Sequence, residues 1–176
     1  MKLKTHNAFS IGILTVIGSF FTSPLLSLIS ASLLALMANQ IIDMLGHSKN
    51  AKGYIVRTPL THTMFRSILW GLIPAAILFL VFRIARHYPA FHIPDGYPYW
   101  ILLQGIFAGP LHMSMDIITE GGIFFKKNGK FKRYALAHIA YNDPFWNMFF
   151  QIIGIALVFL IFYLKGIHGG HYGRIV

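Results

Sequence analysis

The sequence predicts an all-α protein, a bundle of about five helices embedded in a membrane. Composition is the first reason: 56% of the 176 residues are hydrophobic and only 11% are charged, whereas about a quarter of the residues of a soluble domain are charged. The second reason is that the apolar residues form separate runs with the basic residues gathered between them. The length is that of one domain, so residues 1–176 are expected to form a single unit.

Each apolar run predicts one helix, and the runs cover residues 8–21, 25–45, 67–86, 99–115 and 145–164. A helix needs about 20 apolar residues to cross a hydrocarbon core of ~30 Å. The second and fifth runs meet this length, and the third and fourth nearly do. The first run is short and follows a basic start, as in a signal peptide. No small-x-small cleavage site follows it, so we favour a signal anchor or a true first helix.

The basic residues divide unevenly between the two ends of the predicted helices. If all the runs cross the membrane, eleven lysines and arginines fall on the side of the N-terminus and four on the other side. Basic loops stay in the cytoplasm. The sequence therefore predicts a multi-pass protein of the plasma membrane, with the N-terminus, the 46–66 loop and the 119–142 loop on the cytoplasmic face.

This topology would bring distant histidines and carboxylates to one membrane face. The candidate metal ligands there are His6, Asp43, His62, His112, Asp116, His138 and Asp143. His112 and Asp116 are four residues apart, as are Asp43 and His47, so each pair can face one ion from a single helix side. An ionisable residue at membrane depth needs a partner. Because the chain has no cysteine, zinc held by imidazole and carboxylate is favoured, with manganese or iron as alternatives.

The order of these residues resembles the ligand order of the zinc-dependent phospholipase C and P1 nuclease group, an all-helical fold with a three-metal phosphodiesterase centre. It is even more similar to the YdjM-like membrane-bound metal-dependent hydrolases and their short archaeal and archaeal-virus relatives. In that family an "HRGxTHS"-like segment precedes an HxxxD helix. Here the corresponding segment is "VRTPLTHT", with Val56 in place of the leading histidine. The resemblance extends from Thr5 to about Asp143.

The resemblance implies a set of ligand roles. Asp43, His62, His112 and Asp116 would together hold one ion. Asp116 would also bridge to a second ion held by His6. A further ion in the phospholipase group uses a histidine and an HxxxE motif, but here His138 is followed by Asn142 and then Asp143. We therefore expect one or two divalent ions.

These residues favour a membrane-bound metal-dependent hydrolase that cleaves a phosphoester of the lipid or polyprenyl phosphate class with a metal-activated water. Asp43 or Glu120 can accept the proton or orient the attack. Cations expected on the same face can hold the phosphate group: Arg57, Arg66, Lys126 and Lys127. The expected partners are membrane lipid and a small-molecule or lipid phosphoester.

Two other functions remain open from the sequence. A metal-ion transporter is disfavoured because its site would normally lie near the midplane, whereas these ligands gather at one face. A non-catalytic membrane protein with a structural metal would have no open coordination position. A nucleic-acid partner is not expected, because the basic and aromatic residues of segment 124–134 also suit anionic headgroups.

Overall fold

The computed structural model describes residues 1–91 and 93–172, and over these residues the chain forms five α-helices and two small antiparallel sheets. The helices are α1 (Leu3–Ser19), α2 (Pro24–Gly46), α3 (Met64–Ala85), α4 (Tyr97–Asp116) and α5 (Pro144–Tyr172), with a short 3-10 helix at Pro89–Phe91. The sheets pair β1 (His47–Lys49) with β2 (Ile55–Arg57), and β3 (Ile123–Lys127) with β4 (Lys130–Tyr134). The predicted helical class is confirmed; the hairpins were not predicted.

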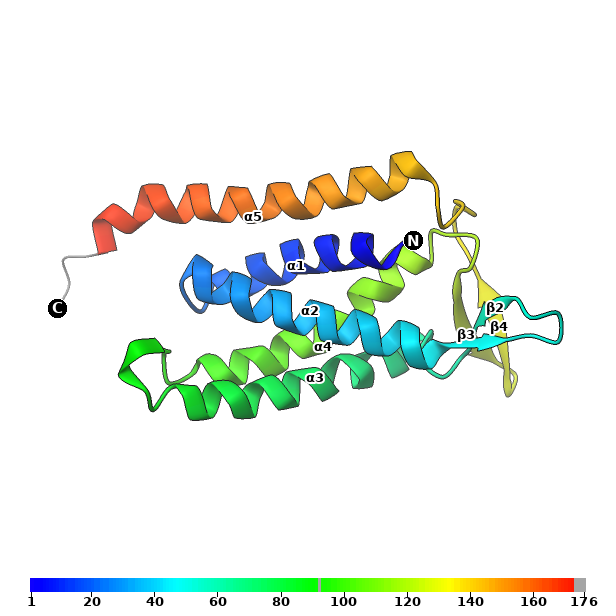
Figure 1. Cartoon of the computed structure of the whole chain (residues 1–176), viewed down its shortest axis with the longest axis horizontal. Coiled ribbons are helices and arrows are strands. Elements are labelled where there is room, and N and C mark those ends of the chain that lie inside the picture. The colour runs from blue at the N-terminus through cyan, green and yellow to red at the C-terminus, as the bar shows by residue number, and fades with distance from the viewer. Residues whose placement is uncertain (92, 173–176) are drawn as a thin grey trace.

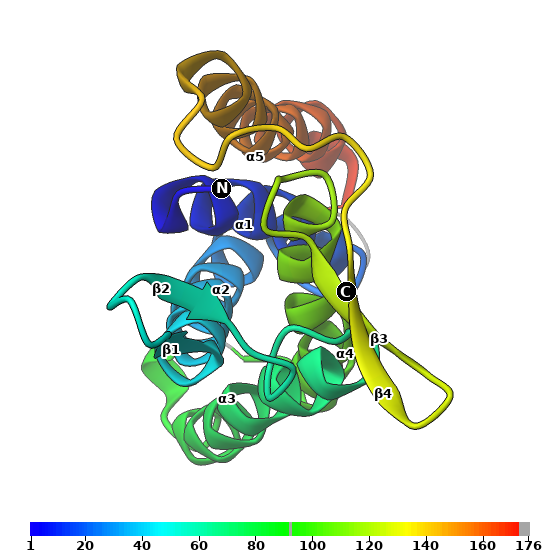
Figure 2. The same cartoon turned by 90° about the vertical axis from the view of Figure 1, so that its right-hand side faces the viewer.

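The helices run back and forth along the long axis, so successive connections lie at alternate ends (Figure 1). The N-terminus and both sheets lie at one end, and α5 finishes at the other. Helix α1 contacts α2, α4 and α5, and α4 contacts α3 as well as α1 and α2. Seen from the end that carries the sheets, the two hairpins lie on opposite sides of the bundle (Figure 2). Both α1 and α4 thus have neighbours on several sides.

Side-chain caps place the starts of two helices. The Ser23 hydroxyl accepts from the backbone N–H of Leu26 at 3.3 Å, and Pro24 occupies the first turn of α2, as is common at helix starts. In the same way, the Thr63 hydroxyl accepts from Arg66 N at the start of α3. This cap explains why α3 begins three residues before the predicted run.

Small residues let the helices approach closely. A Cβ on Gly109 of α4 would overlap the backbone of Ser67 in α3, and a Cβ on Gly12 of α1 would overlap the backbone of Gly154 in α5. Close backbone contact through small residues is typical of helix pairs in membranes. The main core lies between α1, α2, α3 and α4 and is centred on Leu14, Leu34, Ala75, Leu78 and Ile101.

Three helices are long and apolar enough to cross a membrane: Pro24–Gly46, Met64–Ala85 and Pro144–Gly166. Helix α1, with 17 residues, and helix α4 are not among these candidate spans. The outer surfaces of α3 and α5 are strongly apolar; Phe65 is 85% exposed and Phe159 is 71% exposed. Extended exposed apolar surface indicates contact with a membrane or another apolar partner. The structure therefore supports membrane association at this coarse level.

Candidate metal centre

The end of the bundle that carries the sheets contains a cluster of histidines and aspartates. His6 lies in the first turns of α1, Asp43 near the end of α2, and His62 just before α3. His112 and Asp116 lie in the last turns of α4. All of these side chains are buried except Asp43, which is 21% exposed. The structure thus brings five of the predicted ligands together from four parts of the chain.

In this cluster, the Nε2 atoms of two histidines each lie close to the same two carboxylate oxygens. His112 Nε2 lies 3.3 Å from Asp116 Oδ2 and 3.4 Å from Asp43 Oδ1. His62 Nε2 lies 3.5 Å from Asp116 Oδ2 and 3.8 Å from Asp43 Oδ1. Ligands placed ~2.1 Å from a tetrahedral zinc ion are roughly 3.4 Å from one another. These four of the six separations among the atoms are therefore close to those of a four-ligand site for one ion.

Hydrogen bonds on the far side of each ring set the orientation of both histidines. Thr61 donates its hydroxyl proton to the carbonyl of Ile42 at 2.9 Å, so this hydroxyl accepts from His62 Nδ1, also at 2.9 Å. His112 Nδ1 donates to Asn39 Oδ1 at 3.0 Å, and the Asn39 amide in turn donates to Asn7 Oδ1 at 2.9 Å. With Nδ1 donating on both rings, the neutral form of each ring carries its lone pair on Nε2, toward the carboxylates.

In the neutral form of the two rings, the lone pairs and the carboxylates face each other as acceptors. The buried atoms His62 Nε2, His112 Nε2 and Asp116 Oδ2 have no hydrogen-bond partner among the described residues. Buried polar atoms without partners are costly and rare. A divalent cation bound by all four side chains would satisfy these atoms together. Two imidazoles and two carboxylates fit zinc, and they also suit manganese or iron.

The other oxygen of Asp116 has a different environment. Arg57 Nη2 donates to Asp116 Oδ1 at 2.6 Å, and His6 Nε2 lies 3.2 Å from the same oxygen. The nitrogen of Met1 lies 3.5 Å from it. Asp116 therefore turns one oxygen to the four-ligand cluster and the other to a group of nitrogen donors. The guanidinium of Arg57 occupies the side where the resemblance would place a second ion.

Burial keeps the His62 imidazole uncharged. The pKa of His62 is lowered from the ordinary 6.5 to about 3, and desolvation is the largest cause. The carboxylate of Asp116 opposes this shift, whereas His112 and Arg57 reinforce it. A neutral imidazole is the form that binds a metal. His62 is thus held in its ligand form over the physiological pH range.

Two glycines make room for the cluster. A Cβ on Gly46, at the end of α2, would overlap Thr61 Oγ1 and the ring of His62. A Cβ on Gly121, in the turn after α4, would overlap the guanidinium of Arg57. Arg57 also donates to Thr119 Oγ1 at 3.2 Å and to the carbonyl of Gly122 at 3.0 Å. Hairpin β1–β2 and the turn after α4 together therefore hold this guanidinium against Asp116.

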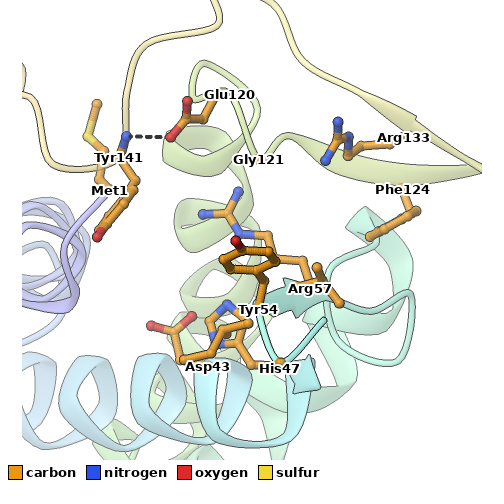
Figure 3. A pocket seen from close by; sticks show the side chains of 13 residues that line it. Met1, Asp43, His47, Tyr54, Arg57, Glu120, Gly121, Phe124, Arg133 and Tyr141 are labelled. Atoms are coloured by element: carbon orange, nitrogen blue, oxygen red, sulfur yellow. Dashed lines mark hydrogen bonds between the residues drawn. The ribbon is translucent and has the colours of Figure 1, made fainter. Parts of the chain in front are cut away.

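The cluster opens onto a pocket of about 670 Å³. Asp43 and His47 lie on one side of this pocket, Glu120 and Tyr141 lie on the opposite side, and Arg57 lies between them (Figure 3). Glu120 is exposed, and its Oε1 accepts from Tyr141 N at 3.4 Å. Glu120 therefore borders the cavity and is not a member of the four-ligand cluster.

Some predicted site residues lie elsewhere. His138 is exposed and has a φ of 51°. Asp143 Oδ1 accepts from Trp146 N at 3.0 Å, as a cap at the start of α5. Neither residue belongs to a group of three His or carboxylate ligands within 4.8 Å of one another among the described residues. Arg66 and Lys126 lie at a second pocket.

Sequence reasoning missed several residues of the centre. Asn39 and Thr61 orient the two histidines, and Arg133 lines the pocket. Asn39 lies four residues before Asp43 on α2, which is a helical spacing that points it to the same side. The sequence has no comparable signal for Arg133, because its position depends on the path of hairpin β3–β4.

The fold and the site define a helical protein with three candidate membrane spans and a buried His–Asp cluster at one end of the bundle. The chain belongs to the DUF1286 family, described as a protein family of unknown function, whose model matches residues 1–115. That match includes every residue of the cluster except Asp116. No curated protein and no solved structure gives a significant match to this chain. The resemblance to metal-dependent hydrolases accordingly stays a prediction.

Proposed function

We propose that the protein is a membrane-bound metal-dependent hydrolase that cleaves a phosphoester and uses one divalent ion at His62, His112, Asp43 and Asp116. One observation carries this proposal. The Nε2 atoms of two histidines and two carboxylate oxygens converge at 3.3 to 3.8 Å, and among the described residues three of these four atoms are buried without a hydrogen-bond partner. A divalent cation bound among these atoms would satisfy all of them together, and an unsatisfied buried polar atom is costly.

The position of the cluster supports catalysis over a purely structural role. Three of the four ligands are buried, but Asp43 borders the large pocket and is partly exposed. A water molecule or a substrate in the pocket can therefore reach the ion position. A divalent ion in such a site polarises a phosphoryl oxygen and lowers the pKa of a bound water to roughly 7. A closed structural site would have no such access.

The cations of the pocket suit a phosphate group. Arg57 is 13% exposed and lies between Asp116 and the pocket. Arg133 lines the same pocket from β4. Guanidinium groups bind phosphate oxygens with paired hydrogen bonds. Arg57 would thus hold the substrate beside the ion, and Glu120 at the pocket rim would take up the proton released on attack.

The surroundings of Asp116 favour one ion over two. A second ion at Oδ1 would need the space in which Arg57 Nη2 lies 2.6 Å from this oxygen. The guanidinium already supplies a positive charge there. Arg57 would therefore take the place of a second metal as the electrostatic partner of Asp116.

The membrane part of the proposal rests on the three candidate spans and the uneven distribution of basic residues. We place the metal centre at the cytoplasmic face of the plasma membrane, because the basic loops lie at that end. A pocket at this level can receive a substrate from the bilayer. Apolar lining residues such as Tyr54, Ile55 and Phe124 suit the hydrophobic part of a lipid or polyprenyl phosphate.

The deciding experiment combines metal analysis with a hydrolysis assay. Detergent-purified protein should contain about one zinc, manganese or iron ion per chain and should hydrolyse bis-p-nitrophenyl phosphate in a metal-dependent way. His112→Ala and Asp116→Ala should lose both properties, whereas His87→Ala, at an exposed histidine near the opposite end, should retain both. Unchanged metal content in the two cluster variants would contradict the proposal. Zinc flux into liposomes without hydrolysis would identify a carrier instead.

A further inference from the structure

We infer that a second pocket, between the start of α3 and hairpin β3–β4, binds one anionic phospholipid. The inference rests on the membrane insertion included in the proposed function and does not depend on the metal centre. The pocket has a volume of about 350 Å³. It lies at the same end of the bundle as the metal centre, where the helices would emerge into the headgroup layer.

The walls of this pocket are largely aromatic. Phe65 comes from the first turn of α3, Phe124 and Phe125 come from β3, and Phe131 comes from β4. Phe65 is 85% exposed and Phe125 is 44% exposed. These rings offer an apolar surface that is open to the exterior, which suits the hydrocarbon part of a lipid and not a free inorganic ion.

Two cations complete the pocket. Arg66 donates from Nη1 to the carbonyl of Pro59 at 2.9 Å, and its guanidinium carbon lies 5.0 Å from the centre of the Phe131 ring. These contacts hold the guanidinium plane in place and leave its other N–H groups for a ligand. Lys126 supplies the second charge. A phosphodiester headgroup matches one planar guanidinium and one ammonium group.

The β3–β4 hairpin places basic residues where they can contact an anionic headgroup. Lys126 pairs with Phe131 and Lys127 with Lys130 in the antiparallel register, and side chains of paired residues lie on the same face. Lys126 and Phe131 therefore face the pocket together. The two strands carry five basic residues and no acidic residue. All five acidic residues of the chain lie in the described part, and none of them lines this pocket. An unopposed positive potential of this kind attracts anionic headgroups.

Helix α3 continues the site toward the bilayer. Leu69 lies one turn after Phe65, on the same side of the helix, and is 62% exposed. This helix is one of the three candidate spans. A lipid with its phosphate at Arg66 and Lys126 can thus lay an acyl chain along Phe65 and Leu69. This continuity favours a membrane lipid as the occupant over a soluble phosphate compound.

The site is separate from the proposed catalytic pocket. Phe124 lines both pockets and forms the wall between them. No member of the His–Asp cluster lines the second pocket. The lipid held there would accordingly be a bound, unreacted neighbour of the catalytic pocket. It would fix the β3–β4 hairpin, and with it Arg133, at the membrane surface.

The test is native mass spectrometry of delipidated, detergent-purified protein titrated with phosphatidylglycerol or with phosphatidylcholine of the same acyl chains. Wild type should bind one phosphatidylglycerol per chain at least about tenfold more tightly than phosphatidylcholine. The double variant Arg66→Gln/Lys126→Gln should lose most of this preference. The matched control Lys127→Gln/Lys130→Gln removes the same charge from the hairpin tip and should keep affinity within about twofold of wild type. Circular dichroism should confirm that both variants are folded.

Equal loss of affinity in the two double variants would overturn the inference, because it would indicate diffuse attraction to the hairpin. Equal binding of the two lipids by wild type would also overturn it, as would displacement of phosphatidylglycerol by millimolar inorganic phosphate.

Metal content is measured on the same samples. Lipid binding without metal would refute the hydrolase proposal alone, and metal without selective lipid binding would refute the lipid site alone. Release of the protein from membranes by alkaline carbonate would refute membrane insertion.

Discussion

His112 donates its Nδ1 proton to Asn39 at 3.0 Å, and its Nε2 thereby faces the carboxylates of Asp43 and Asp116. The carboxamide of Asn39 is itself oriented by its bond to Asn7. A chain of side-chain hydrogen bonds from α1 through α2 thus sets the tautomer of a histidine on α4. Partners of this kind orient metal ligands and tune their basicity.

Removal of this partner should weaken metal binding without removing a ligand. Asn39→Ala is expected to lower zinc affinity about 10-fold to 100-fold, because the ring of His112 can then rotate or protonate at Nε2. Competition with a fluorescent chelator measures this affinity. Gln104→Ala is the control, since Gln104 is an equally buried amide that donates to the carbonyl of Leu14 away from the cluster. Similar affinity loss in both variants would show that general destabilisation is the cause.

A methyl group at Gly46 should displace His62. Gly46→Ala places a Cβ against Thr61 Oγ1 and the His62 ring, so the loop before α3 must shift. We expect metal content to fall well below one ion per chain and the melting temperature to decrease, because overpacking costs about 1–3 kcal/mol. Gly96→Ala is the control, since the nearest atom to a Cβ there is 4.0 Å away. Metal content equal to that of wild type would contradict the assigned position of His62.

Replacement of Arg57 should change the number of bound ions. Arg57→Ala removes the guanidinium from Asp116 Oδ1 and leaves His6 beside that oxygen. Zinc titration followed by elemental analysis should then show a second, weaker site in addition to the first. Arg133→Ala, which removes an arginine that lines the pocket without an ion pair to Asp116, should keep one ion. One ion in both variants would show that Arg57 does not fill a second metal position.

Metal removal should destabilise the protein. A ligand present at about 1,000 times its dissociation constant stabilises the folded state by ~4 kcal/mol, which corresponds to a melting shift of about 10 °C for a chain of this size. Chelation by EDTA should lower the melting temperature of wild type by this order, as measured by differential scanning fluorimetry in detergent. Asp116→Ala should melt at the same temperature with and without EDTA.

The metal-free protein should lose stability in acid through His62. Its pKa is lowered to about 3 in the folded chain and is 6.5 in the ordinary state. Between these values the unfolded chain binds more protons than the folded chain, so stability falls as pH decreases from 6.5 toward 3. His62→Gln should make the stability of chelated protein less dependent on pH in this window. His87→Gln, at an exposed histidine near the other end of the bundle, is the control substitution.

Several features of the site follow from local sequence. The apolar runs place α2, α3 and α4 to within three residues at each end, whereas α1 begins five residues before its run and α5 ends eight residues after its run. The alternation of the runs puts His6, Asp43, His62, His112 and Asp116 at one end. His138 and Asp143 were assigned to the same end from the same pattern. At that end, however, Asp143 caps α5 and His138 is exposed. An alternating topology determines the end at which a residue lies but not its distance from the other ligands.

The amino-acid sequence alone determined the number of helices, their approximate limits and the common end of the candidate ligands, because hydrophobic runs and i, i+4 spacings act over a few turns of chain. Only the tertiary structure decided that Asp116 offers one oxygen to the four-ligand cluster and the other to Arg57. Only it showed that Asn39 and Thr61 orient the histidines. These relationships join residues up to 73 positions apart, and they arise from helix packing and hairpin paths that no local pattern encodes.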